Sequence, residues 1–144
     1  MENTEFQRKS HLRETQIQAK AVARILATGD FLPVDELADR FPAQSMLSPS
    51  AFEAWEAEER IFSITQESLE LYPSYAFSAK GELLPCLRDV LMTLRPYKSS
   101  WGMAFWFGSA NSFLGCKQPK HLLLLQPELV LAAANVEASS YLYE

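Results

Sequence analysis

WGMAFWFGSANSFLGCKQPKHLLLLQPELVLAAANV, residues 101–136, is the most apolar stretch of the chain and decides its fold. Aromatic side chains crowd its first turns, a loop with turn-forming residues follows at 108–119, and four consecutive leucines lead into a last apolar run at 129–134. Exposure of so much apolar surface to water is unfavourable, so we expect the stretch to be buried in the chain's own core or against a partner. The side chains expected to share one core are Trp101, Phe105, Trp106, Leu122, Leu125 and Val130.

The composition indicates a globular chain without a membrane span. Of the 144 residues 48% are apolar and 22% are charged, a balance typical of folded rather than disordered proteins. The net charge of −5 gives no general reason to expect binding to nucleic acid or to an anionic membrane. The polar N-terminus is unlike a signal peptide, and the apolar run near Leu122 is far too short to span a bilayer. Cys86 and Cys116 match no metal-binding spacing, and so few cysteines indicate a reducing cytoplasm.

The first half of the chain is predicted to hold one long helix and two short ones. Helical periodicity runs over 4–28, and Gly29 is placed to end that helix. Pro33 fits the start of a second helix, and Ser48 with Pro49 fits the start of a third, which runs to about residue 60.

A β-hairpin is predicted at 61–77. Two short β-rich runs are separated there by a polar turn, and Pro73 places the second run at a sheet edge. Two short helices followed by a hairpin predict a helix-turn-helix with a β-hairpin wing.

The charge of the third helix opposes its insertion into a DNA groove. A recognition helix approaches a polyanion and usually carries basic or amide side chains. Residues 50–59 contain no base, and packing or dimerisation is therefore at least as good an interpretation of this module as DNA binding. The acids on this helix are Glu53, Glu56, Glu58 and Glu59. The residues that could contact nucleic acid lie in the first helix and are Arg8, Lys9, Arg13, Lys20 and Arg24.

Residues 79–144 are predicted to form a compact bundle of four short helices. Leucines repeat with helical spacing over 84–94, a serine precedes the aromatic helix, and Pro119 and Pro127 fit the first turns of the last two helices. The expected fold is mainly α, with a degenerate helix-turn-helix and β-hairpin wing in residues 1–78 and the helical domain after it.

The loop after the aromatic helix reads Gly-Ser-Ala-Asn-Ser-Phe-Leu-Gly-Cys-Lys-Gln-Pro, residues 108–119. It resembles the Xre/MbcA/ParS-type toxin-binding domain of bacterial antitoxins, in which an aromatic helix and a break with an asparagine precede Leu-Gly-Gly-Arg-x-Pro. Asn111, Leu114, Gly115 and Pro119 match that pattern. The resemblance covers about residues 25–137.

Three positions depart from the family pattern. Cys116 stands where a second glycine is usual, and Lys117 stands where arginine is common. Glu59 stands where members that carry a helix-turn-helix have a glycine before Arg-Ile-Phe.

The resemblance implies a cytoplasmic bacterial antitoxin that sequesters a toxin, often one that consumes NAD, and that assembles as a homo-oligomer. In several members the C-terminal segment reaches the toxin's active site, which by position points to Tyr141 and Tyr143 here. The residues that the resemblance places in the toxin-binding motif are Asn111, Leu114, Gly115, Lys117 and Pro119.

Local geometry offers a second interpretation of the same motif. Gly115 suits a turn with positive φ, Pro119 fixes the start of a helix, and Asn111 can bond nearby backbone. A helix junction is therefore favoured over direct contact with a ligand.

The sequence predicts no enzyme, cofactor or metal site. His121 lies on a polar helix start, His11 lies in the first helix, and neither is close in sequence to Cys86 or Cys116. No glycine-rich phosphate loop, Gly-x-Ser-x-Gly motif or metal-binding cluster occurs. Three functions stay open: an antitoxin-like binding protein that sequesters a partner toxin, with or without autoregulatory DNA binding; a DNA-binding regulator without a toxin; and an orphan structural or interaction protein of the same fold.

Overall fold

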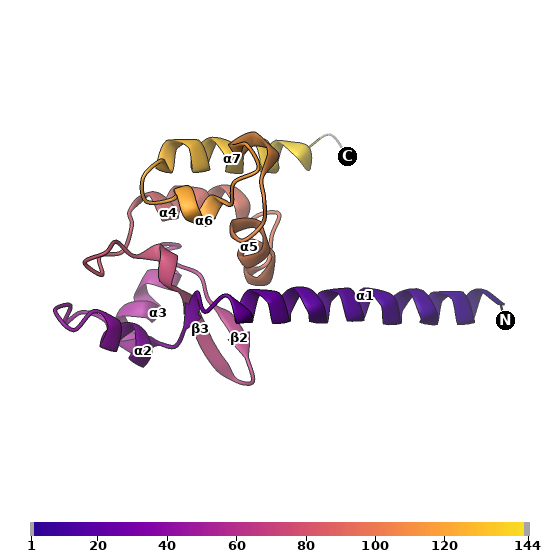
Figure 1. The fold of residues 1–144 in the computed structure, drawn as a ribbon, viewed down its shortest axis with the longest axis horizontal. Helices are drawn as coiled ribbons and strands as arrows, with labels where there is room; N and C mark the ends of the chain where they lie inside the picture. Colours follow the sequence, from indigo (N-terminus) through magenta and orange to yellow (C-terminus); the bar gives the residue numbers. More distant parts are fainter. Residues whose placement is uncertain (1, 143–144) are drawn as a thin grey trace.

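The computed structural model describes residues 2–142, and within the first helix it describes the side chains of residues 7–9, 12, 13 and from 15 onward. The prediction of a mainly α chain with a β-hairpin is confirmed (Figure 1). The helices are α1 (Glu2–Ala27), α2 (Val34–Arg40), α3 (Pro49–Ala57), α4 (Cys86–Leu94), α5 (Ser100–Phe107), α6 (Pro119–Leu122) and α7 (Pro127–Ser140), with the short 3-10 helices η1 (Ser74–Ala76) and η2 (Ser112–Leu114). The strands are β1 (Phe31–Leu32), β2 (Ile64–Gln66) and β3 (Leu69–Pro73).

The elements form two groups with α5 between them. In Figure 1, α4, α6 and α7 lie on one side of the molecule, and α2, α3 and the sheet lie on the other. The helix α1 joins the body at its C-terminal end and projects away from it over the rest of its length.

The last turns of α1 pack against α5. Ile25 is buried, and the half-buried Leu26 packs against the core. The helix ends where Gly29 takes a φ of +74°, a conformation that a Cβ disfavours, as the sequence predicts. A Cβ on Gly108, at the end of α5, would lie 3.2 Å from Cδ1 of Ile25, so this glycine permits the close approach of the two helices.

The sheet has the order β1-β3-β2 and is antiparallel throughout. The predicted hairpin lies within 61–77, and its turn at Glu67–Ser68 has positive φ at both residues, as a type I′ turn requires. The prediction that Pro73 lies in an edge strand is wrong, because β1 pairs with the outer side of β3. Pro73 is the last residue of β3, and β2 pairs with β3 only as far as Leu71. The missing N–H of Pro73 therefore removes no hydrogen bond to β2.

Serine side chains cap two of the short helices. The Ser48 hydroxyl accepts from the Ala51 N–H at 3.2 Å, and the Ser99 hydroxyl accepts from the Gly102 N–H at 3.1 Å. Such caps contribute about 1 kcal/mol each to helix stability. The connector between α2 and α3, residues 41–48, is longer than the three- or four-residue turn usual in a helix-turn-helix.

One continuous core joins both halves of the chain, and Phe107 lies at its centre. This fully buried side chain from α5 stacks on Phe62, with ring centroids 5.9 Å apart and an interplanar angle of 12°. It also meets Tyr75 at 5.5 Å. The division of the chain after residue 78 stays a prediction, but the two parts share these aromatic contacts.

Most of the expected core is found, with one error. The side chains that lie in the core or pack against it are Trp101, Phe105, Trp106, Leu122 and Val130. The assignment of Leu125 was wrong, because this side chain is 82% exposed. The helix α6 ends at Leu122, so helical spacing does not extend to Leu125, which lies in the connector before α7.

Truncation of Phe107 should be far more costly than truncation of its neighbour Phe105. Phe107→Ala is expected to lower the free energy of unfolding by about 3–5 kcal/mol, because a fully buried aromatic ring leaves a cavity. Phe105 is only partly buried, so Phe105→Ala should lower it by roughly 1–2 kcal/mol. Urea unfolding of both variants measures the difference, and equal losses would contradict the central position of Phe107.

Candidate functional site

The motif that the sequence analysis singled out forms a tight junction between α5 and α6. The Asn111 side chain accepts from the Phe113 N–H at 3.0 Å and caps η2. The Asn111 backbone carbonyl accepts from the N–H groups of Leu114 (3.0 Å) and Cys116 (2.8 Å), and its own N–H donates to the Lys117 carbonyl at 3.0 Å. Four of the five predicted motif residues thus shape the backbone or the core, since Leu114 and Pro119 are buried and Gly115 has a φ of +65°.

Lys117 is the motif residue whose side chain is exposed and available to a partner. The geometry of the other four motif residues agrees with their predicted role in a helix junction.

Two positions at which the sequence departs from the family pattern have left-handed backbone. Cys116 has a φ of +67° and Glu59 a φ of +60°, and at both positions the family has glycine. Glu59 adopts this conformation while its carboxylate accepts from Nε of Arg95 at 3.1 Å, which ties the end of α3 to the end of α4. The side chain of Cys116 is exposed.

Replacement of Cys116 by glycine should therefore stabilise the chain. A left-handed conformation costs an L-residue about 1–2 kcal/mol, and the greater freedom of glycine in the unfolded chain offsets about 0.5–1 kcal/mol of that. Cys116→Gly is expected to raise the free energy of unfolding by about 0.5–1 kcal/mol in denaturant titrations. Cys116→Ser keeps the Cβ and should leave stability unchanged, so a gain in the serine variant would trace the effect to the thiol instead.

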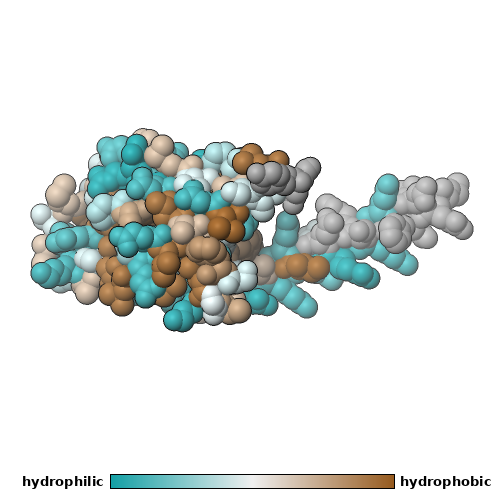
Figure 2. Space-filling model, turned by 90° about the horizontal axis from the view of Figure 1, so that it is seen from above, coloured by the Kyte–Doolittle hydropathy of each residue, from teal (hydrophilic) through white to brown (hydrophobic). Residues whose placement is uncertain are grey.

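Exposed apolar side chains gather beside this junction. We call these residues the α6–α7 surface, and they are Phe113, Leu124, Leu125, Leu129 and Val136, with exposed fractions from 46% to 82%. Figure 2 looks onto this side of the molecule and shows hydrophobic side chains among hydrophilic ones on it. On α7 the inner side is formed by the buried Val130, Ala133 and Ala134, and the exposed residues are the apolar Leu129 and Val136 together with the polar Glu128, Asn135, Ser139 and Ser140. Leu129 and Val136, together with the exposed Phe113, Leu124 and Leu125, make the α6–α7 surface a candidate protein-binding surface.

A cavity of about 220 Å³ opens next to the α6–α7 surface, between the end of α5, the loop after it and α7. It is lined by Trp106, Ser109, Ala110, Asn111, Ser112, Phe113, Ala133, Val136 and Glu137. Trp106 was expected only in the core, because a tryptophan in an aromatic helix carries no sequence signal of a cavity.

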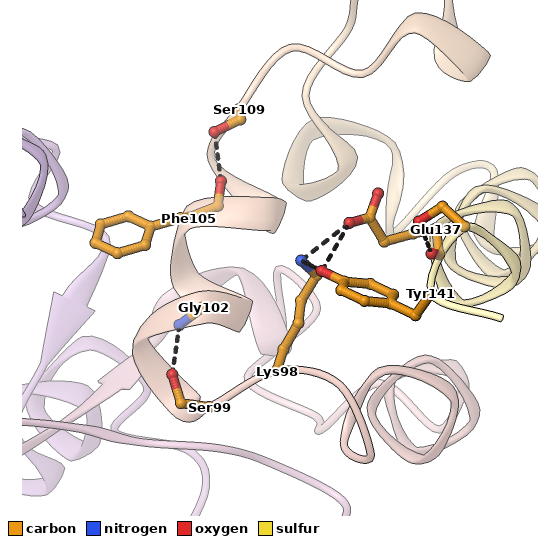
Figure 3. A network of polar contacts seen from close by, with 8 residues as sticks. Lys98, Ser99, Gly102, Phe105, Ser109, Glu137 and Tyr141 are labelled. Atoms are coloured by element: carbon orange, nitrogen blue, oxygen red, sulfur yellow. Dashed lines mark hydrogen bonds and ion pairs between the residues drawn. The ribbon is translucent and has the colours of Figure 1, made fainter. Parts of the chain in front are cut away.

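A polar clasp holds the end of α7 against the segment that precedes α5 (Figure 3). The Lys98 ammonium lies 3.0 Å from Glu137 Oε1 and donates to the Tyr141 hydroxyl at 3.1 Å. Burial alone would lower the pKa of Lys98, but the hydrogen bonds to Tyr141 and Glu137 raise it. The Tyr141 ring also stacks on Tyr97, with centroids 4.9 Å apart. Tyr141, predicted as a partner contact, is thus held within the chain, and Tyr143 lies outside the described residues.

The glutamates of α3 are mostly engaged in internal contacts. The buried Tyr72 hydroxyl donates to Glu56 and, at 3.1 Å, to Glu70, which ties α3 to the hairpin. Glu58 forms an ion pair with Arg60 at 3.5 Å. The side chain of Glu53 is exposed, and it keeps the outer face of α3 acidic.

Because the pKa values of two buried tyrosines are raised, we expect the chain to lose stability in alkaline solution. Burial and the hydrogen bond to Glu56 raise the pKa of Tyr72 far above its ordinary value, and burial does the same for Tyr75. An unfolded tyrosine titrates near pH 10, so above that pH the unfolded chain loses protons that the native chain retains. The free energy of unfolding should therefore be constant at neutral pH and fall above about pH 10.

Chemical denaturation between pH 8 and about pH 11 measures this slope. Tyr72→Phe should make the slope shallower by up to one proton, although it lowers stability at pH 8 through the lost hydrogen bonds. Parallel curves for wild type and variant would show that Tyr72 titrates normally in the native state.

The basic residues predicted to contact nucleic acid form a stripe along α1. At 100° per residue, Lys9, Arg13, Lys20 and Arg24 fall within about 60° of one another and span about 22 Å of the helix. All four are exposed, and they lie opposite the face on which Ile25 packs. Arg8 is also exposed but lies on the flank of the helix. The stripe therefore faces solvent on the element that projects from the body (Figure 1).

The cysteines, histidines and acidic residues were predicted not to form a catalytic or metal site. Among the described residues no three His, Cys, Asp or Glu side chains are grouped so that they could hold a metal ion. Burial raises the pKa of the Cys86 thiol, which works against its use as a nucleophile. His121 is exposed. No helix in residues 2–142 is long and apolar enough to cross a membrane.

Comparison with protein-family models, curated proteins and solved structures finds no match for this chain.

Proposed function

We propose that this chain is an antitoxin-like binding protein that docks and sequesters a partner protein through its α6–α7 surface. The observation that carries the proposal is the exposure of Leu129 and Val136 on α7 and of Leu124 and Leu125 just before it. Burial of apolar surface is the main driving force of protein association, and exposed patches on soluble proteins commonly mark interfaces.

The partner class comes from the resemblance. A toxin-binding domain of the Xre/MbcA/ParS type would bind a toxin, often one that consumes NAD, in the bacterial cytoplasm and as a homo-oligomer. The positive φ at Glu59 and Cys116 supports the resemblance, because both positions have the backbone that the family's glycines would favour. An adjacent reading frame of toxin type would favour this function over that of an orphan interaction protein or a regulator without a toxin.

The α6–α7 surface can be tested with two leucines of equal exposure. Leu124 on that surface and Leu69 on the hairpin are both 51% exposed. A tagged chain purified from its native host should carry one partner protein in near-stoichiometric amount. The Leu124→Asp variant should capture roughly tenfold less of that partner, because binding would bury a carboxylate at the interface. Leu69→Asp is the matched control and should retain the partner.

Both variants should unfold at the wild-type denaturant midpoint, since each leucine is half exposed. Equal capture by wild type and Leu124→Asp, or equal loss in both variants, would show that the partner does not dock on this surface.

A second candidate function, operator binding, is favoured by the basic stripe of α1 alone. The acidic outer face of α3 opposes groove insertion, because repulsion between its carboxylates and phosphates acts within about 8 Å at physiological salt. The stripe lies on a helix that projects away from α3, so it could contact DNA phosphates while the acidic face of α3 stays away from the duplex. We expect DNA binding to be weak near physiological salt and to depend on the stripe.

Titration of a labelled duplex separates the stripe from α3. Replacing Lys9, Arg13, Lys20 and Arg24 by alanine should abolish measurable binding, whereas Arg8→Ala on the flank should have a small effect. Glu53→Ala should change binding little, and Glu56 is unsuitable for this test because it holds Tyr72. Tight binding that survives the loss of the stripe and weakens in Glu53→Ala would instead place α3 in the groove.

A further inference from the structure

A groove on the side of the molecule that holds α2 and α3 carries an inference about pairing between copies of the chain. The groove is a cavity of about 320 Å³ that opens between the N-terminal parts of α2 and α3 and the start of β3. None of the residues that line it belongs to the α6–α7 surface, so the inference does not rest on the proposed function. We call it the α2–α3 groove, and its apolar and acidic lining residues include Val34, Pro49, Leu69, Asp35, Glu53 and Glu70.

The acidic residues of the groove have no basic partner within the chain. No lysine or arginine in the described part of the chain forms an ion pair with Asp35, Glu53 or Glu70, and all three are exposed. Glu70 accepts a hydrogen bond from the Tyr72 hydroxyl at 3.1 Å, but that donor is neutral and leaves the negative charge uncompensated. Since apolar walls surround these charges, the groove favours a ligand that brings both an apolar side chain and positive charge.

The helix α1 offers this combination on its exposed side. Ile17 is 60% exposed although it is apolar. Arg13 lies four residues before it and Lys20 three residues after it, and side chains at these separations are neighbours on a helix. Both cations are exposed, and among the described residues no acid pairs with either. Ile17 therefore lies between two unpaired positive charges that are about 10 Å apart along the helix.

The net charges of the two regions are also opposite. The helix α1 has five basic and three acidic residues, whereas residues 29–60, which contain α2 and α3, have two basic and eight acidic ones. Charge complementarity of this kind favours docking of one region on the other.

The helix of the same chain is not placed to fill the groove. It is continuous over Glu2–Ala27, its C-terminal end is fixed where Ile25 is buried against the core, and the rest projects away from the body (Figure 1). We propose that the α2–α3 groove receives α1 of a second copy of this chain, with Ile17 against the apolar walls and Arg13 and Lys20 beside the acids. These two cations belong to the basic stripe, so a chain paired in this way no longer offers them to DNA phosphates.

Charge reversal on either side tests the pairing. In sedimentation velocity runs of the full chain, the average mass should rise with protein concentration, and added salt should reduce the rise because exposed ion pairs are screened. Arg13→Glu/Lys20→Glu should weaken self-association roughly tenfold, because two attractions become repulsions. Glu53→Lys should weaken it as well, and this exposed position can take a lysine without loss of the fold.

A matched control separates these contacts from the effect of net charge. Arg8→Glu/Lys80→Glu makes the same change in net charge as the helix variant, at exposed positions outside the basic stripe and the groove. This variant should associate as the wild type does.

A mixture of two reversed chains gives the sharpest readout. Arg13→Glu/Lys20→Glu has an acidic helix and an acidic groove, whereas Asp35→Lys/Glu53→Lys has a basic helix and a basic groove. Each should associate poorly alone, because its helix and its groove carry like charges. In an equimolar mixture each helix meets a groove of opposite charge, so association should return.

A wild-type mass that does not change with concentration would overturn the pairing, and it is also the result expected if α1 closed on the groove of its own chain. Undiminished association of the reversed helix variant, or no association in the mixture, would overturn it equally. Capture of a partner on the α6–α7 surface involves other elements and is measured separately, so either proposal can fail while the other holds.

Discussion

The stacking of Phe107 on Phe62 is the contact on which the rest of the structure depends. It places α5, from the second half of the chain, against the hairpin of the first half. The end of α1 then packs on α5 beside Gly108, and the loop that starts at the same glycine directs η2 and α6 to α7. The core that positions the cavity and the α6–α7 surface therefore includes the hairpin, although no hairpin residue lines the cavity.

The basic residues of α1 and the exposed apolar residues of the α6–α7 surface lie on different elements of the chain. The helix α1 has five basic and three acidic residues, whereas the rest of the chain has eight basic and fifteen acidic ones. The α6–α7 surface lies on different elements from the basic stripe of α1. A protein partner on α7 and a polyanion on α1 would thus not compete for one surface. This separation makes the two proposed functions compatible and independently testable.

Local signals in the sequence predicted the elements well, whereas packing decided the site. Ser48 and Gly29 act through bonds and backbone within a few residues, and each was placed correctly from sequence alone, whereas the sequence left the cap of α5 open between Ser99 and Ser100. The central position of β3 could not be predicted, because the pairing of Phe31 with Pro73 joins residues far apart in the chain. The cavity likewise brings together Trp106 and Glu137 from two helices.

The most direct test of partner binding at the α6–α7 surface is photo-crosslinking in the native host. A benzoylphenylalanine at position 125 reacts with whatever covers that surface, and the same residue at position 50, on the exposed start of α3, is the control. We predict that position 125 cross-links to one partner protein, different from this chain, and that position 50 does not cross-link to that partner. The same products from both positions, no product from position 125, or a cross-link to a second copy of this chain would contradict the proposed partner surface.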